Sequence, residues 1–193
     1  MGPLRARARA VASALLIVAG LLGARPAQAR SDPGRAEPTA QQVEAVFLFY
    51  FSQFVNWPPT AFADERSPIV IGVLGDDPFG GALDQAVAGE RVTGRPVVVR
   101  RLSSIAEATR CHILYISSSE APQLQQILSA LEGHNVLTVS DLDHFAQSGG
   151  MIRFVLADRH VRLLVNARAA QSAGLKLSSK LLRAAAPAGP GQD

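Results

Sequence analysis

Short runs of apolar residues alternate with helix-forming segments along most of the chain. Four runs rich in β-branched and aliphatic side chains indicate buried strands at Ile69–Leu74, Val97–Leu102, His112–Ile116 and Val136–Val139. Helix-starting and helix-ending residues between and after them predict helices at 78–88, at 104–109, from 119 to just before 133, and at 141–147. This alternation is typical of an α/β fold with a three-layer, mostly parallel sheet.

Two further apolar runs, Met151–Leu156 and Val161–Asn166, are separated by only four residues. That spacing predicts an antiparallel β-hairpin near the C-terminus. Its cationic residues are Arg153, Arg159, His160 and Arg162. They serve either as solvated charges that keep sheet edges from pairing, or as a surface for an anionic small molecule or an acidic partner.

The first predicted helix is rich in aromatic residues. Thr39 and Gln42 fit a capping box at its start, and Pro58 stops it after about Asn56. At 100° per residue, one face, which we expect in the core, holds Val43, Val46, Phe47, Tyr50, Phe51, Phe54 and Trp57. Phe49 lies on the opposite side, with Ala45, Ser52 and Asn56.

A helix that is apolar nearly all round is either completely buried or shared with another chain. Both readings remain open for this helix. Under the second reading we expect a partner or a second copy of the chain to contact Phe49, Phe54 and Trp57. Because Phe54 and Trp57 also fit the core face, Phe49 is the strongest of the three candidates.

Residues 1–29 have the layout of a secretory signal peptide, with arginines, then an apolar run from Ala10 to Leu22, then Ala27-Gln28-Ala29. A membrane anchor is the alternative, but the apolar run is shorter than the roughly 20 residues that span a bilayer. We therefore expect a periplasmic protein that is not membrane-embedded. The expected organisation is a disordered leader at 30–39, a single domain at 40–183 and a disordered tail at 184–193.

The basic character of the chain belongs to its first 29 residues. The whole sequence of 193 residues carries a formal net charge of +3. Four of the 19 basic residues and none of the 16 acidic residues lie in positions 1–29, so the remainder carries −1. The charge therefore gives no reason to expect a nucleic acid as partner.

Candidate ligand-binding residues follow two of the predicted strands, where α/β sheets usually bind ligands. They are Asp76, Asp77, Ser117, Ser118 and Ser119. The first loop lacks the glycine spacing of a phosphate-binding motif and also fits a tight turn before a helix. The sequence shows no nucleophile elbow and no histidine spacing for a metal, so we expect no enzyme, metal or cofactor.

An ordered series of short motifs resembles the YfiR-like family from about Gln42 to Arg183. The motifs are Tyr50-Phe51-Ser52-Gln53-Phe54-Val55-Asn56-Trp57-Pro58, Ile71-Gly72-Val73-Leu74-Gly75-Asp76-Asp77-Pro78-Phe79-Gly80, Cys111-His112-Ile113-Leu114-Tyr115-Ile116-Ser117, Leu137-Thr138-Val139-Ser140-Asp141, Gly149-Gly150-Met151-Ile152, and Gly174-Leu175-Lys176-Leu177-Ser178-Ser179-Lys180-Leu181-Leu182.

The resemblance implies a periplasmic α/β protein that is not an enzyme. It implies a homodimer that represses an inner-membrane diguanylate cyclase, or another sensor protein, by binding its periplasmic part and so controls cyclic-di-GMP signalling. It further implies an outer-membrane lipoprotein that can sequester the repressor. Better-known members carry disulfide-forming cysteine pairs, whereas Cys111 is the single cysteine here.

Two other functions fit the sequence less well. A periplasmic small-molecule sensor or solute-binding module would use the strand-end loops at Asp76, Asp77 and Ser117–Ser119. An enzyme would need an activated nucleophile among the same serines, and nothing in the sequence selects one.

Overall fold

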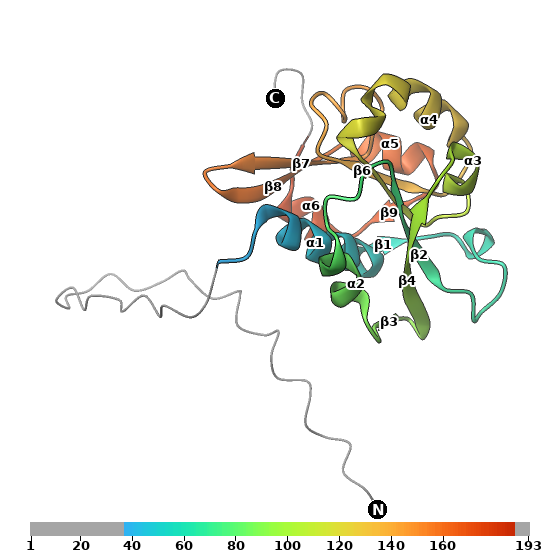
Figure 1. Cartoon of the computed structure of the whole chain (residues 1–193). Coiled ribbons are helices and arrows are strands. Elements are labelled where there is room, and N and C mark those ends of the chain that lie inside the picture. Colours follow the sequence, from blue (N-terminus) through green and yellow to red (C-terminus); the bar gives the residue numbers. More distant parts are fainter. Residues whose placement is uncertain (1–36, 188–193) are drawn as a thin grey trace, which may run out of the picture. The chain divides into compact units, whose positions relative to one another are not determined.

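The computed structural model describes residues 37–187 of the chain (Figure 1). The predicted signal peptide at 1–29, most of the predicted leader and residues 188–193 of the predicted tail lie outside this part. Thr39 begins the described fold as the N-cap of α1 (Ala40–Phe54), where its hydroxyl accepts from the Gln42 N–H and the Gln42 side chain accepts from the Thr39 N–H. The capping box predicted from the sequence is confirmed.

Eight strands of the described residues form one sheet, in the order β10-β8-β7-β6-β5-β2-β4-β3. The four central strands are β6 (Leu137–Ser140), β5 (Ile113–Ile116), β2 (Ile69–Leu74) and β4 (Arg95–Leu102). The outer strands are β7 (Ile152–Ala157), β8 (His160–Val165), β10 (Ala186–Pro187) and β3 (Arg91–Val92). Most neighbours are parallel, while β7–β8 and β3–β4 are antiparallel. The predicted mixed, mostly parallel α/β sheet is confirmed.

Helices and short helical turns connect these strands. The other α-helices are α2 (Gly81–Val87), α3 (Ile105–Ala108), α4 (Leu124–Ala130), α5 (Ala167–Ser172) and α6 (Ser179–Ala184). Two 3₁₀ turns are η1 (Pro59–Ala61) and η2 (Ser118–Gln123). The helix predicted at 141–147 is wrong, because that segment is a series of turns in which His144 has a φ of 56°.

Two short strands that the sequence did not predict pair outside the main sheet. β1 (Val55–Asn56) follows α1 directly and pairs antiparallel with β9 (Lys176–Leu177). The first helix therefore ends at Phe54 rather than near Asn56. At the other end of the chain, β10 pairs with β8, so the fold extends past the predicted boundary at residue 183.

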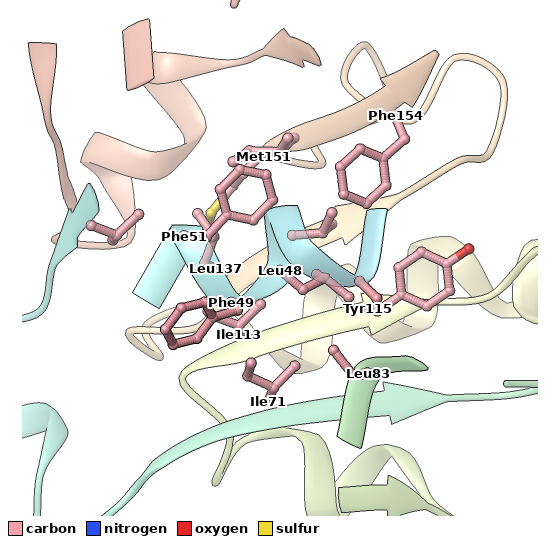
Figure 2. Packing of buried hydrophobic residues seen from close by; sticks show 14 of the residues in the cluster. Leu48, Phe49, Phe51, Ile71, Leu83, Ile113, Tyr115, Leu137, Met151 and Phe154 are labelled. Carbon is pink, nitrogen blue, oxygen red and sulfur yellow. The ribbon is translucent and has the colours of Figure 1, made fainter. Parts of the chain in front are cut away.

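Side chains of the central strands alternate between two apolar clusters on opposite faces of the sheet. Ile71 and Val73 of β2 join the cluster under α1 and α2, and Figure 2 shows residues of this cluster. Val70 and Leu74 join the second cluster, under α3 and α4. A side chain at Gly72 would meet the Cys111 sulfur at 2.6 Å, so only glycine lets the thiol pack over β2.

The β7–β8 hairpin extends beyond both of its neighbours. Strand β6 pairs with β7 only at Ile152 and Arg153, and β10 pairs with β8 only at Leu164 and Val165. Residues 154–163 therefore form a two-stranded projection, called here the hairpin arm, that is visible beside α1 in Figure 1.

Candidate functional site

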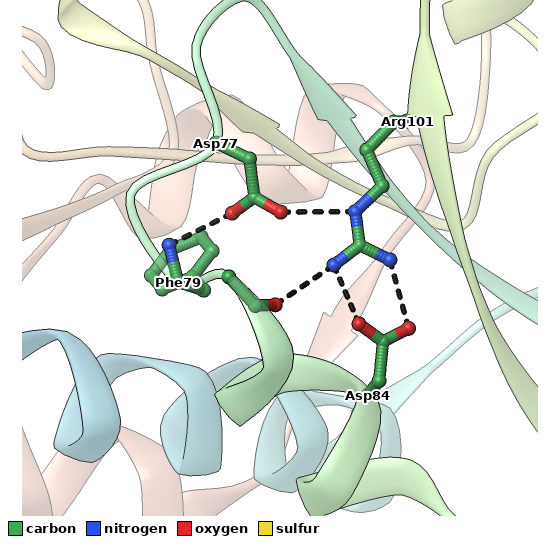
Figure 3. Close-up of polar contacts among 5 residues, drawn as sticks. Asp77, Phe79, Asp84 and Arg101 are labelled. Atoms are coloured by element: carbon green, nitrogen blue, oxygen red, sulfur yellow. Dashed lines mark hydrogen bonds and ion pairs between the residues drawn. The ribbon is translucent and has the colours of Figure 1, made fainter.

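The strand-end loops are tied to one another and to the rest of the fold. The connections after β2 and β5 leave in opposite directions, which makes this the place where open α/β sheets usually bind ligands. Asp77, after β2, accepts from the Phe79 N–H at 2.8 Å and pairs with Arg101 at 2.9 Å (Figure 3). Arg101 also binds Asp84 through two nitrogens and donates to the Gly80 carbonyl.

This network explains why α2 begins at Gly81 and not at Pro78 as predicted. Asp77 closes a turn over Phe79, and the guanidinium of Arg101 on β4 fastens that turn to the first residues of the helix. The hydrogen bonds from Arg101 hold the pKa of Asp84 below its usual value. The carboxylate of Asp77 is thus committed to holding the loop.

The serines after β5 serve the adjoining turn. Ser119 accepts from the Asp76 N–H at 3.0 Å, and buried Ser117 caps η2 by accepting from the Ser119 N–H. Ser118 is exposed. In the described residues the hydrogen bonds of Ser117 and Ser119 come from backbone N–H groups, and no histidine is among the partners of these serines. A role for the five loop residues in ligand binding stays a prediction.

Helix α1 turns most of its predicted core face outward, although Phe51 of that face is buried as expected. Phe49, expected to face outward, is 8% exposed, and its neighbours Ala45 and Ser52 are at 0% and 2%. The outward side instead carries half-exposed apolar side chains with helical spacing, called here the α1 stripe: Val43, Val46, Phe47, Tyr50 and Phe54. Phe49 is therefore a core residue, and the contact role expected for it is wrong.

The reversal has a physical cause. Ala45 and Ser52 are small and fully buried, so they let the helix backbone come close to the sheet. Leu48 and Phe51 pack into the apolar cluster on the same side (Figure 2). A charged residue normally marks the outward side of a helix, but the single charge of α1 is Glu44, which is buried. The apolar pattern alone therefore could not tell the two sides apart.

A hollow of about 580 Å³ lies between the α1 stripe and α2. Its apolar lining includes Val43, Val46 and Phe47 from α1 and Ala82 and Ala86 from α2. Its polar lining residues are uncharged glutamines, Gln42 and Gln85. Farther along the stripe, Tyr50 and Phe54 stack with ring centroids 6.1 Å apart. Aromatic side chains without charges are typical of the centre of a protein–protein interface.

Trp57 lies beyond the C-terminal end of α1 and is half-buried in a different aromatic group. The His112 ring meets it edge-on at 6.0 Å and stacks on Phe62 at 4.5 Å. The guanidinium of Arg95 lies over the ring of Phe62, 3.9 Å from the ring centre. Burial lowers the pKa of His112, and its Nδ1 accepts from the Val70 N–H. Phe54 therefore belongs to the stripe, whereas Trp57 packs within the fold.

The residues of the predicted cationic cluster on the hairpin lie in different environments, one buried and the others exposed. Arg153 is 6% exposed and forms an ion pair with Asp143, so its expected place on the surface is wrong. Arg162 is exposed and pairs with Asp158 at 3.2 Å. Arg159 is exposed in the turn with a φ of 62°, a conformation that usually favours Gly or Asn. Near this turn, Leu156 is 63% exposed on the hairpin arm.

Sequence reasoning passed over Glu44. It is 8% exposed, and burial, followed by the nearby charge of Asp141, raises its pKa to about 7. The Tyr115 hydroxyl lies close to Asp141 as well, and burial and that carboxylate raise its pKa. A lone acidic residue in an otherwise uncharged helix is the one sequence signal that could have revealed this position.

A family model described as YfiR/HmsC-like matches residues 41–186, which is well over half of the chain. The chain belongs to the YfiR/HmsC-like family. No curated protein matches it significantly. Membership implies a periplasmic regulator of cyclic-di-GMP signalling, and the family suggests a membrane diguanylate cyclase as partner.

Three further features of this YfiR/HmsC-like domain concern its cysteine, its helices and its potential metal ligands. Its single cysteine, Cys111, is 5% exposed, and burial raises the pKa of the thiol to about 11, so little reactive thiolate exists near neutral pH. Across residues 37–187, no helix has the length and apolar character needed to cross a membrane. No cluster of potential metal ligands occurs in the same residues.

Proposed function

We propose that this YfiR/HmsC-like protein represses an inner-membrane diguanylate cyclase by binding its periplasmic part through the α1 stripe. The observation that carries the proposal is an uncharged, aromatic helix face on a member of a regulatory family. A solvated helix of 15 residues ordinarily carries charges on its outward side. Here that side holds only apolar residues and glutamines, which suits contact with another protein.

The mechanism is stoichiometric and involves no catalysis by this chain. Binding to one conformation of the cyclase shifts that enzyme's equilibrium toward the inactive state. Holding it about 99% inactive needs several kcal/mol of preference for that state. An interface of about 1,000 Å² with a buried aromatic centre can provide this energy. Phe47, Tyr50 and Phe54 are the aromatic residues of the stripe.

The hairpin arm extends the proposed contact surface. Phe154, at its base, packs against Phe47 of the stripe with ring centroids 6.2 Å apart. Leu156 adds an exposed apolar side chain farther out, with exposed Arg159 and Arg162 nearby. The arm therefore supplies the polar, charged rim that interfaces place around an apolar centre.

The experiment compares two matched substitutions on α1 in a strain that lacks the gene. Val46 and Gln41 are both exposed, but only Val46 belongs to the stripe. We expect wild-type protein and Gln41→Lys to lower cellular cyclic-di-GMP and Val46→Lys to leave it high. Equal repression by the two variants, at equal protein levels, would contradict the proposal.

A second copy of the chain or an outer-membrane lipoprotein is the competing use of the same surface. Sedimentation of the purified protein separates the first possibility from cyclase binding. If Val46→Lys turns a dimer into a monomer and repression persists, the stripe serves dimerisation. If the oligomeric state stays unchanged and repression is lost, it serves the cyclase.

A further inference from the structure

The strongest unused feature of the fold is the buried side chain of Glu44. It lies on α1 next to Val43 of the outward stripe in sequence, but the residue is only 8% exposed. Within residues 37–187, no hydrogen bond or ion pair reaches its carboxylate. Burial of a carboxyl group that has no charged or hydrogen-bonding partner costs much more when the group is ionised than when it holds a proton.

The groups that face Glu44 make its ionisation still less favourable. Asp141, which follows β6, is the charged group that acts on it, and Tyr115 of β5 brings a hydroxyl to the same place. Figure 2 shows that hydroxyl pointing away from the apolar cluster under α1. Asp77, after β2, adds a third carboxylate that acts on Tyr115.

The cations on the neighbouring elements do not offset the cost of ionising Glu44. Arg101 of β4 is bound to Asp77 and to Asp84 of α2. Arg162 of β8 pairs with Asp158. Arg153 of β7 pairs with Asp143. The other cationic or titratable basic residues on these elements, none of which is among the groups that shift the pKa of Glu44, are Arg95 and Arg100 of β4, His160 of β8, and Lys180 and Arg183 of α6. Burial and Asp141 are the two causes that act on Glu44, and both favour its protonated form.

We propose that Glu44 holds a proton when α1 is seated on the sheet, and that loss of this proton loosens the helix that carries the stripe. This regulation rests on the proposed function, because it controls the same docking surface. Its direction follows from the charges: acid seats α1 and favours docking, whereas alkali drives Glu44 toward water and weakens docking. An exported regulator would thereby respond to the pH of its surroundings.

The raised pKa of Glu44 lies in the pH range where such control operates. A carboxyl with a pKa of about 7 is mostly protonated at pH 5.5 and mostly ionised at pH 8. Packing of α1 against the sheet buries Phe51 and Leu48 together with Glu44. Protonation of Glu44 is therefore coupled to the packing of a whole helix face. The stripe on the other face keeps its position only while that packing holds.

Amide hydrogen exchange of the full chain tests the proposal without any partner. Corrected for intrinsic exchange, we expect protection of α1 in the wild type to fall at least tenfold between pH 5.5 and pH 8. Glu44→Gln, which is neutral and nearly isosteric, removes this dependence and keeps α1 protected at both pH values. Glu132→Gln is the control, because Glu132 is exposed, and it keeps the wild-type response.

The outcomes separate the two proposals. Equal protection of wild-type α1 at both pH values, or the same pH response in Glu44→Gln, overturns the proton switch whatever the partner is. A carbon-detected titration of the Glu44 carboxyl gives a second measurement, and a midpoint below pH 5 overturns it as well. Failure of Val46→Lys to relieve repression concerns only the docking proposal and leaves the exchange result standing.

Discussion

Phe47 of α1 packs against Phe154 of β7, with ring centroids 6.2 Å apart and ring planes inclined at 42°. Phe154 is 2% exposed, and Phe51, one turn along the helix, stacks on the same ring at 6.0 Å. The first helix and the base of the hairpin arm thus meet at the ring of Phe154. Displacement of α1 would therefore also release the arm.

A double-mutant cycle measures this connection. We expect Phe47→Ala and Phe154→Ala to show a coupling of about 0.5–1.5 kcal/mol in the free energy of unfolding, the range for aromatic pairs. Phe154→Ala alone should cost about 3 kcal/mol or more, because Phe154 is buried. Urea denaturation of the four proteins gives both values, and strictly additive effects would refute the coupling.

Phe49 provides the sharpest test of the reversed helix. Phe49→Ala should lower the free energy of unfolding by about 3 kcal/mol, because it empties a buried site. Val46→Ala, on the exposed side, should cost less than about 1 kcal/mol. Chemical denaturation distinguishes the two, and a larger cost at Val46 would show that the outward face has been assigned wrongly.

The stability of the protein should depend on pH through Glu44. Its pKa is raised from 4.5 to about 7 in the folded state, so the folded protein binds more protons than the unfolded chain between these values. Stability therefore falls as the pH rises through this window. Glu44→Gln should remove a penalty of about 2–3 kcal/mol at pH 8 and change little at pH 4.

Thermal unfolding of wild type and Glu44→Gln at several pH values tests this dependence. The difference in melting temperature between the two proteins should grow steadily from pH 4 to pH 8. A constant difference would show that Glu44 titrates alike in the folded and unfolded chains.

The loop after β2 should depend more on Asp77 than on Asp84. Asp77 accepts from the Phe79 N–H and binds Arg101, and its side chain is 18% exposed, whereas that of Asp84 is 53% exposed. We expect Asp77→Ala to cost about 1–2 kcal/mol and Asp84→Ala under about 1 kcal/mol. Urea denaturation at low and high salt checks both, and Asp84 should show the larger salt effect.

Cys111 should be inert in the folded protein. Its thiol is buried over Gly72 and its pKa is raised to about 11, so both access and thiolate content are low. Labelling with a disulfide reagent at pH 7.5 should proceed at the rate of opening and become fast only in denaturant. Rapid labelling of the native protein would show that this residue is accessible.

The sequence by itself determined the six longer strands of the sheet. The runs at Ile69–Leu74 and Val97–Leu102 are apolar and β-branched over the length of a buried strand, and both lie within β2 and β4. The capping box at Thr39 was equally predictable from the sequence, because it depends on side chains three residues apart. Local chemistry is sufficient for features of this kind.

Only the tertiary structure decided which sides of these elements meet water. Phe49 and Tyr50 are adjacent aromatic residues, yet one is buried and the other lies on the stripe, because Ala45 and Ser52 bring that side of α1 close to the sheet. Arg153 likewise leaves the surface because Asp143, ten residues earlier, lies beside it. Burial depends on what packs opposite, and a chain read residue by residue does not contain that information.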